Sequence, residues 1–368
     1  MKINQASQVH ARSSKVGILL TNLGTPQAPT AKDVKVYLKQ FLSDSRVVEI
    51  PRIIWWFILN LIILPIRSGA SAKKYQSIWT KDGSPLKVWS QLQADLLAQE
   101  LSKHNAGAVV VEMAMRYGHP SIEQALDNLN SQGVDRLLVL PLYPQYSATT
   151  SASTFDEIFR IYSKLRDQPA LRLVKHYHDH PAYIEALKQQ VEDYWAVHGR
   201  PDFAAGDRFV MSFHGVPRRT LDLGDPYHCE CLKTGRLLRE ALGLSPQEAI
   251  TSFQSRFGKA EWLKPYTAAM LEDLGKKGVR RLDIFCPGFP ADCLETLEEV
   301  AMEGCEIFQH AGGQQYHAIP CLNGHQAWID ALKTMSLENL GGWNLELQTQ
   351  EELKQRQERF ELAQAASK

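Results

Sequence analysis

The sequence lacks the motifs that identify the commonest nucleotide-dependent, nucleophile-dependent and zinc-dependent enzymes. It has no G-x-x-x-x-G-K-[ST] loop, and no G-x-G-x-x-G follows a predicted strand. It also has no G-x-S-x-G nucleophile elbow and no H-E-x-x-H zinc motif. The sequence therefore lacks the usual motifs of enzymes that catalyse phosphoryl transfer, hydride transfer or serine hydrolysis.

An excess of charge and a long apolar run are missing as well. The 41 basic and 41 acidic residues cancel, which argues against a general nucleic-acid binder. Residues Met1–Lys15 are polar without an apolar centre, so we expect no signal peptide. The most apolar run, Ile53–Ile66, is shorter than the roughly 20 residues that span a bilayer. It is either a buried core helix or an apolar lip on a pocket, in peripheral contact with a membrane surface.

Cysteines are few for a chain of 368 residues. None of the six forms a C-x-x-C pair, and in a chain this long they do not indicate a disulfide framework. We therefore expect a reducing, cytoplasmic location, with possible peripheral association at the inner membrane.

The length and the 44% hydrophobic content predict two domains. Short apolar runs alternate with helical stretches, which predicts an α/β protein with parallel sheets and right-handed crossovers. The predicted strands are Val16–Asn22, Ala108–Met115, Arg136–Leu142, Leu171–Tyr177, Arg208–Phe213, Ala249–Phe253, Arg281–Cys286 and Tyr316–Ile319. They form two similar halves around a cleft: residues 15–170, with 320–337 packing back on them, and residues 171–319. Residues 343–368 form a charged tail, either a solvated helix or a frayed end.

One stretch ends a strand on a titratable side chain. The run Phe209–Phe213 stops at His214 and turns at Gly215 and Pro217. Because ligands bind beyond the carboxyl ends of strands in open α/β sheets, His214 is a candidate chemical residue. The alternative is a packed histidine bonded to a loop carbonyl.

A second stretch points to the same cleft. The strand Arg281–Cys286 breaks at Pro287, and a helix is predicted to start with Asp292 as N-cap. Glu295 then lies in the first turn, and Glu299 lies one turn later on the same face. First-turn acids can also simply complement the helix dipole, which explains Glu295 better than Glu299.

Other strand ends contribute apolar, aromatic and polar side chains. Aromatic walls suit a flat hydrophobic ligand, and a histidine with two acids suits a metal or a proton-transfer step. The strand-end residues are Leu23, Arg116, Tyr117, Tyr143, Tyr146, Ser212, Ser252, Gln254 and Arg256, with Trp262 not far beyond.

Several motifs in register resemble the ferrochelatase family. They are Leu20–Pro26, Met115–Gly118, Ser212–Pro217, Gly224–Tyr227, Phe253–Gly258, Cys286–Phe289 and Asp292–Glu299, and the resemblance runs in order from about Val16 to Leu332. It implies two flavodoxin-like halves, each with a four-stranded parallel sheet flanked by helices, that hold a porphyrin between them. It also implies a lyase that inserts Fe²⁺ into protoporphyrin IX to form protohaem, the last step of haem synthesis.

The resemblance also implies roles for individual residues. His214 matches a metal ligand and proton acceptor, Glu295 the acid paired with it at the metal, and Glu299 a second acid on the proton or metal route. Residues that match the substrate site are Leu23, Tyr117, Trp262 and Ser212, with Arg116 and Arg67 as cations near the cleft. The apolar run from Ile53 matches the lip over the porphyrin.

The sequence departs from the family pattern in ways that bear on ligands. Cys293 stands where many members have histidine, which puts a third histidine ligand in doubt. Some members bind a [2Fe-2S] cluster through cysteines of a C-terminal extension, but no cysteine follows Cys321 here, so we expect no cluster and no other tightly bound cofactor.

Leu23 stands where coproporphyrin-type members tend to have tyrosine, which favours protoporphyrin IX. Coproporphyrin, a chelatase for another metal or tetrapyrrole, and a porphyrin or haem carrier remain as alternatives. We expect a monomer with porphyrin and Fe²⁺ as its partners and no nucleic acid.

Overall fold

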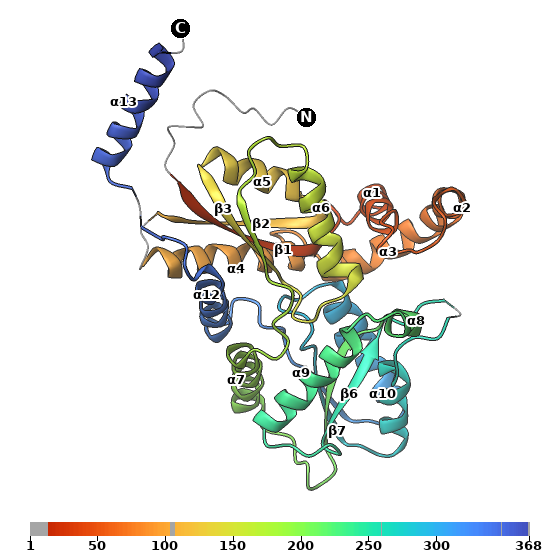
Figure 1. Ribbon diagram of the computed structural model, residues 1–368. Coiled ribbons are helices and arrows are strands. Elements are labelled where there is room, and N and C mark those ends of the chain that lie inside the picture. The colour runs from red at the N-terminus through yellow and green to blue at the C-terminus, as the bar shows by residue number, and fades with distance from the viewer. Residues whose placement is uncertain (1–13, 104–106, 259, 347, 367–368) are drawn as a thin grey trace.

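The protein consists of two α/β halves, each built on a four-stranded parallel sheet (Figure 1). The structure is a computed structural model that describes residues 14–103, 107–258, 260–346 and 348–366. The strand orders are β2-β1-β3-β4 and β6-β5-β7-β8, which is the same order twice. This confirms the predicted fold class, and each predicted strand is present.

The first sheet has two buried faces because β1 packs helices on both sides. Its strands are β1 (Lys15–Gly24), β2 (Val109–Tyr117), β3 (Val134–Pro141) and β4 (Ala170–Leu173). Ile18 and Leu20 belong to a core that includes Leu97 of α4, whereas Leu19 points into a core with Leu126 of α5. Alternate side chains thus enter opposite cores, which explains the near-continuous apolar run of β1.

Two of the helices of the first half begin at a side-chain cap. The Thr30 hydroxyl accepts the N–H of Asp33 at the start of the first helix, and Ser121 and Gln124 form a full capping box. The helices are α1 (Ala31–Leu42), α2 (Arg52–Ile58), η2 (Leu59–Ile63), α3 (Leu64–Ile78), α4 (Pro85–Ser102), α5 (Ile122–Ser131), η3 (Ala148–Ala152) and α6 (Ser153–Tyr162).

The second half repeats this plan. Its strands are β5 (Arg208–His214), β6 (Ala249–Gln254), β7 (Arg281–Phe285) and β8 (Gln315–Ala318). Its helices are α7 (Pro181–His198), α8 (Arg218–Asp222), α9 (Tyr227–Ala241), α10 (Thr267–Lys276), η4 (Glu295–Glu303) and α11 (Gly304–His310). Phe209 and Phe213 of β5 enter the same core as Leu20 of β1, so one apolar core joins the two halves.

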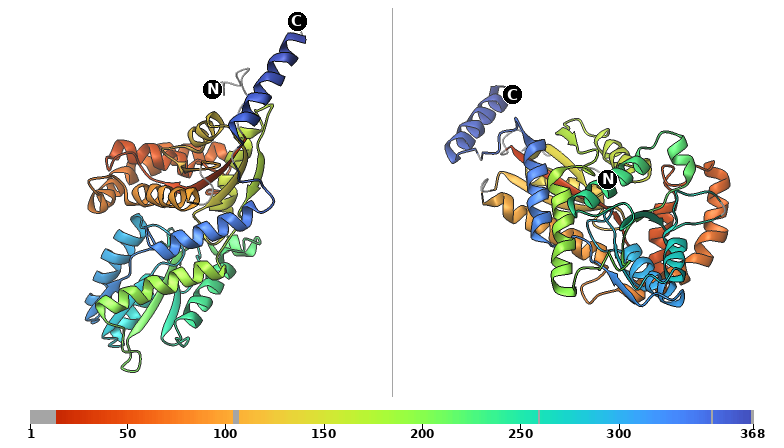
Figure 2. Two further views of the ribbon diagram at one scale, coloured as in Figure 1. Left: turned by 90° about the vertical axis from the view of Figure 1, so that its left-hand side faces the viewer. Right: turned by 90° about the horizontal axis from the view of Figure 1, so that it is seen from below.

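Two long helices cover the junction of the halves. Figure 2 shows α7 and α12 (Gln326–Leu340) running side by side there, and α12 also packs on α4. Helix α12 therefore contacts both halves, through α7 and through α4. The predicted boundary between residues 170 and 171 is wrong, because β4 starts at Ala170 and pairs with β3 in the first sheet. The change of halves lies in the segment between Leu173 and Pro181.

The ends of the chain lie outside this core. Helix α13 (Gln350–Ala366) projects from the body (Figures 1 and 2), so the charged tail is a solvated helix, one of the two predicted alternatives. The polar N-terminal stretch lies outside the described residues, except for Ser14 and Lys15.

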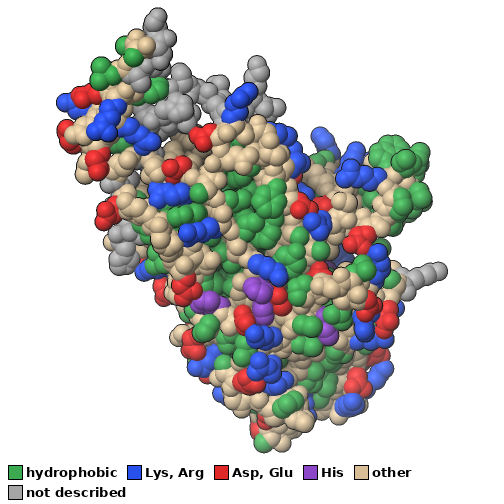
Figure 3. All heavy atoms as spheres, in the orientation of Figure 1, with side chains coloured by type: hydrophobic (Ala, Val, Ile, Leu, Met, Phe, Trp, Pro, Cys, Tyr) green, Lys and Arg blue, Asp and Glu red, His purple; other side chains and the backbone are tan. Residues whose placement is uncertain are grey.

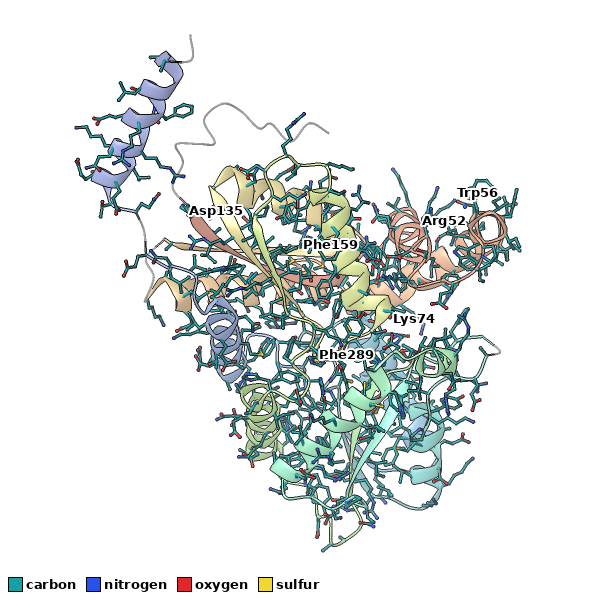
Figure 4. The ribbon with its side chains drawn as sticks, in the orientation of Figure 1. Arg52, Trp56, Lys74, Asp135, Phe159 and Phe289 are labelled. Atoms are coloured by element: carbon teal, nitrogen blue, oxygen red, sulfur yellow. The ribbon has the colours of Figure 1, made fainter. Side chains whose placement is uncertain are left out.

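The most apolar stretch of the chain is not a core helix. Residues 52–78 form one continuous helix through α2, η2 and α3, and Ile53 and Trp56 are 77% and 55% exposed. Apolar side chains gather on the protrusion that carries α2 (Figure 3), and Arg52 and Trp56 lie at its outer end (Figure 4). The structure therefore contradicts the buried-helix alternative. By length and composition alone, this helix could cross a membrane.

Candidate active site

The topology brings the two predicted stretches of the second half to one place. In the order β6-β5-β7-β8, the chain leaves β5 toward β6 on one side and returns through β7 on the other. The carboxyl ends of β5 and β7 therefore flank the point where the connections diverge, which is where ligands bind in such sheets. His214 is the last residue of β5, and the segment from Cys286 to Glu295 follows β7.

The hydrogen bond of the His214 ring determines which nitrogen is free. Nδ1 lies 2.6 Å from the carbonyl oxygen of Gly215. A carbonyl can only accept, so Nδ1 carries the proton and Nε2 of the neutral ring keeps its lone pair. Tyr227 donates its hydroxyl to the His214 carbonyl at 2.9 Å, which holds the strand end. The bond to a loop carbonyl, which the alternative interpretation of His214 expects, is therefore present, and it leaves Nε2 of the neutral ring without a proton.

Gly215 is required because the backbone passes too close to β6 for a side chain. A Cβ there would lie 2.5 Å from the carbonyl oxygen of Gln254 and 3.2 Å from the Trp262 ring. Trp262 is thus placed directly beside the residue that follows His214, consistent with its predicted position at the site.

The acidic segment after β7 forms a π-helix, a form of helix common at functional sites. The predicted N-cap role of Asp292 is wrong, because its carboxylate caps no backbone N–H of this helix. It is buried instead, and it accepts hydrogen bonds from the Thr296 hydroxyl at 2.9 Å and the Asn323 amide at 2.6 Å. Asp292 thereby ties the entry of η4 to the loop after β8.

Glu299 is held by both of its oxygens. Oε1 accepts the backbone N–H of Ser255 and Oε2 accepts the Ser255 hydroxyl, each at 2.6 Å. Ser255 has a φ of 65°, a left-handed conformation uncommon for a residue other than glycine. Strained backbone of this kind persists where surrounding contacts impose it, as at binding sites.

Burial raises the pKa of Glu299, and the negative charge of Glu295 raises it further. The Ser255 hydrogen bonds and a positive His214 act in the opposite direction without cancelling the effect. The three predicted catalytic residues are thus within electrostatic reach of one another. Glu299 is more readily protonated than an ordinary glutamate.

His214, Glu295 and Glu299 do not form a closed metal cage. Within the described part of the chain, the one group of three or more ligand side chains at metal-binding spacing is His176, His178 and Glu230.

The first half supplies a hydrogen-bonded group that sequence reasoning missed. Asp44 accepts from Arg116 at 2.7 Å, from the Tyr117 hydroxyl at 2.8 Å and from the Ser153 hydroxyl at 2.6 Å. Arg116 and Tyr117 come together as predicted, but the Arg116 charge is already paired with Asp44. Neither Asp44 nor Ser153 lies in a motif or at a strand end, so no signal in the sequence marked them.

Hydrogen bonds and burial shift the pKa values of Asp44 and Tyr117 in opposite directions. Burial by itself raises the pKa of Asp44, but hydrogen bonds from Ser153, the Arg46 backbone and Tyr117, together with the Arg116 charge, lower it overall. Burial raises the pKa of Tyr117. The pair therefore consists of an ionised Asp44 and a neutral Tyr117 at neutral pH.

An apolar cluster connects this group with the acidic helix. Tyr117 packs with Tyr37 and Tyr75, and Leu23 and Leu294 lie against the same cluster. Leu294 directly precedes Glu295, so Leu23 and Tyr117 of the first half and the start of η4 form one wall. Burial raises the pKa of both Tyr37 and Tyr75, and the Glu295 charge adds to it. These two tyrosines are further residues near Glu295 that the sequence did not single out.

Charged side chains bridge the two halves at one edge. The guanidinium of Arg67 on α3 lies 4.3 Å from the ring centre of Phe257, which follows β6. Lys74, also on α3, lies 2.8 Å from Glu298 of η4, at the side of the junction seen in Figure 4. The exposed helix that carries the apolar lip therefore continues to the site. Arg67 thereby contacts the segment that follows β6.

Ser212 is not in contact with an open surface. It is fully buried, and its hydroxyl donates to Gln254 at 2.5 Å and lies 2.9 Å from the Thr267 hydroxyl. The prediction that Ser212 binds substrate is therefore corrected: it fastens β5 to β6 and α10 beneath His214.

A separate cavity of about 290 Å³ lies by α6, away from these residues. Phe159 at its rim is marked in Figure 4, and the lining is Phe159, Tyr162, Ser163, Gln168, Pro169 and Leu171. It contains no acid, histidine or cation, so it offers no chemistry to the site.

Comparison with known proteins identifies a matching family and similar folds. Residues 15–340 match the family model described as Ferrochelatase. A solved structure described as SirB from Bacillus subtilis with Fe³⁺ has a TM-score of 0.54 at 15% identity, over 89% of this chain and 96% of that chain. SirB from Bacillus subtilis subspecies spizizenii in complex with cobalt has a TM-score of 0.49 at 14% identity, over 88% of this chain and 95% of that chain. At such identities the likeness concerns the fold alone.

Proposed function

The chain belongs to the ferrochelatase family, and we propose that it inserts Fe²⁺ into protoporphyrin IX to form protohaem. The observation that carries this proposal is the set of groups at the ends of β5 and β7. His214 has a free Nε2, and Glu299 is a carboxylate with a raised pKa within electrostatic reach of both His214 and Glu295. A metal-insertion reaction needs such acceptors.

The reaction releases protons, and His214, Glu295 and Glu299 can each accept them. A free porphyrin carries two inner N–H protons, and both must leave as Fe²⁺ binds to the four nitrogens. Neutral His214 can accept a proton through Nε2, or act as a metal ligand. Glu295 and Glu299 can accept protons and pass them on. The raised pKa of Glu299 brings it closer to the working pH, where a relay group is most effective.

The other residues fit a flat hydrophobic substrate. Tyr117, Leu23 and Trp262 provide apolar and aromatic surface next to the acidic helix and His214. Arg67 lies half-buried at the junction, where a cation could receive a propionate group of the porphyrin. Arg116 is engaged with Asp44, and we propose that it positions Tyr117 rather than binding substrate.

The proposal is tested with purified protein under anaerobic conditions. We expect catalytic loss of porphyrin fluorescence when protoporphyrin IX and Fe²⁺ are both present. The protein should be colourless before porphyrin is added, because we expect no [2Fe-2S] cluster. Stoichiometric quenching without turnover would instead indicate a carrier, which needs His214 as an axial ligand but has no use for Glu295 and Glu299.

The same assay decides between substrates. Leu23 favours protoporphyrin over coproporphyrin through the family resemblance, so turnover with protoporphyrin IX should exceed that with coproporphyrin III. The opposite order would make the protein a coproporphyrin ferrochelatase. Turnover only with another metal and tetrapyrrole would assign it to a different chelatase reaction.

We also propose that the protein is cytoplasmic and touches a membrane through the exposed apolar face of α2, η2 and the first turn of α3, here called the apolar lip. Its exposed large side chains are Ile53, Ile54, Trp56, Phe57, Leu61, Ile62 and Ile66. A contiguous apolar surface of this kind marks an interaction site. Arg52 and Lys73 on the same continuous helix suit anionic lipid headgroups. Porphyrins are poorly soluble in water, so such contact would place the site close to its substrate.

Replacing Trp56 and Phe57 together by glutamate should lower binding to anionic vesicles at least about tenfold, since each change removes an exposed aromatic that can enter the interface and adds a repelled charge. Vesicle flotation measures this. The control is Val197→Glu, which adds one such charge at a position 79% exposed on α7, outside the apolar lip, and should leave vesicle binding unchanged. Equal flotation of the lip variant and the wild type would refute membrane contact through this surface.

A further inference from the structure

A second group of metal-ligand side chains lies outside the proposed active site. His176 and His178 belong to the segment between β4 and α7, and Glu230 lies in the first turn of α9. One ligand atom from each of the three residues lies within 4.8 Å of the others. The group therefore joins the segment that connects the halves to a helix of the second half. Histidine side chains are visible around this junction in Figure 3.

The donor atoms are largely sheltered and one of them is unsatisfied. The side chains of His178 and Glu230 are 6% and 8% exposed. Nδ1 of His178 is buried and has no hydrogen-bond partner among the described residues, although Oε2 of Glu230 lies 3.4 Å away. Buried polar atoms are normally paired, so this nitrogen needs an explanation. A bound cation would supply the missing partner.

The third ligand residue, His176, has an exposed ring that can rotate. His176 is 39% exposed, and its Nδ1 lies 2.6 Å from Oε1 of Glu230. Tetrahedral bonds of 2.0–2.1 Å place neighbouring donor atoms about 3.3 Å apart. The distance of 3.4 Å between His178 Nδ1 and Oε2 of Glu230 is near this value, whereas the 2.6 Å between His176 Nδ1 and Oε1 of the same carboxylate is shorter. Rotation of the exposed His176 ring can lengthen this contact and bring its nitrogen to the spacing of a metal ligand. A metal would then take the place of the proton between His176 and Glu230.

We propose that His176, His178 and Glu230 bind a divalent transition-metal ion such as Zn²⁺, Co²⁺ or Fe²⁺, at a site separate from His214, Glu295 and Glu299. Two imidazoles and one carboxylate are donors that these ions prefer, and three protein ligands leave a position for water. Calcium and magnesium, which require mainly oxygen donors, do not suit this set.

Of the carboxylates near the two histidines, Glu230 is the one available as a metal ligand. Asp179 lies 3.9 Å from Nε2 of His178, but its carboxylate is paired with Lys233. Lys175 lies over the ring of Tyr146, 5.0 Å from its centre. Glu230 is therefore the anionic ligand of the site, and its other contact is the backbone N–H of Tyr146 at 2.7 Å.

Occupation of the site would hold α9 against the segment between the halves. Glu230 bonds to Tyr146 of the first half, and Tyr227, in the same turn of α9, bonds to the backbone of His214. A metal that binds the folded protein raises its unfolding temperature by mass action. The inference does not depend on the proposed function, because binding requires no porphyrin and no turnover.

Cobalt(II) is the probe for the test. In a His214→Ala background, which weakens metal binding at the proposed active site, we expect equilibrium dialysis to show one Co²⁺ per chain with an absorption spectrum of nitrogen and oxygen ligands. Adding His176→Ala should weaken this binding at least about tenfold and abolish the rise in unfolding temperature that Co²⁺ causes.

Matched controls keep the test decisive. The His214→Ala, His310→Ala protein loses an exposed histidine elsewhere and should bind Co²⁺ like its parent. Because His176 is partly exposed, its loss should leave the circular dichroism spectrum unchanged without metal. His178→Ala, which removes a buried ligand, should also abolish binding. Unchanged Co²⁺ affinity after His176→Ala, or no binding by the folded His214→Ala protein, would overturn the proposal.

Discussion

Replacing His214 by alanine is expected to lower the rate of iron insertion at least about 10³-fold while porphyrin binding persists. General acid–base groups contribute about 10² to 10⁴ in rate, and His214 would lose both its proton-accepting and its metal-binding role. Among the residues that the structure describes, its ring bonds only to the carbonyl of the next residue, and the Tyr227 bond is to its backbone. The substitution therefore removes the free Nε2 without removing a contact that holds the fold.

The measurement pairs two fluorescence experiments on the same preparations. Quenching on titration reports the porphyrin dissociation constant, which should change less than about threefold, and loss of porphyrin fluorescence with Fe²⁺ reports turnover. His310→Ala replaces an exposed histidine of α11 and should match the wild type in both. Wild-type turnover in the His214→Ala protein would disprove the assignment of His214. Loss of porphyrin binding in parallel would make it a binding residue instead.

Replacing Glu295 by glutamine should be nearly as damaging, with a loss of at least about 10²-fold in turnover. Glutamine keeps the size of the side chain but can neither accept a proton from the porphyrin nor bind iron as a carboxylate. The wall formed by Leu294, Leu23 and Tyr117 should remain intact, so porphyrin should still bind. Near-normal turnover would remove Glu295 from the catalytic pair and leave His214 to act with Glu299.

The pH dependence separates the two acids. Because the folded pKa of Glu299 is raised, it takes up a proton at a higher pH than an ordinary glutamate and can no longer accept one. Turnover should therefore fall as pH decreases through this raised pKa, above the ordinary glutamate range. In Glu299→Gln the acid limb should disappear or move to lower pH, whereas in Glu298→Gln, which changes the neighbour paired with Lys74, it should not move. An identical acid limb in Glu299→Gln would exclude Glu299 from proton transfer.

The features that the sequence predicts well are those with a local cause. The strand β1 is recognisable because both of its faces are buried, so its residues are apolar almost without interruption. The first helix is recognisable because Thr30 caps the N–H of Asp33 three residues later. His214 and Glu295 follow from the rule that parallel strands present their carboxyl ends at one edge, together with motifs of the family.

Other features depend on residues that meet only in the folded chain. Asp44 carries no motif, yet it fixes Arg116 and Tyr117 because the loop after α1 returns to the end of β2. Ser212 lies in a motif but points into the core, since the partners of its hydroxyl come from β6 and α10.

By itself the sequence determined the class of fold, the eight strands and the histidine and acids at the strand ends, because these follow from periodicity, capping and local motifs. Tertiary structure alone decided that residues 52–78 form a helix with an exposed apolar face, since burial depends on which surfaces are already covered. It also decided that His176 and His178 meet Glu230 on a helix more than fifty positions later. Distances across a fold are set by the packing of whole elements, which no short stretch of sequence records.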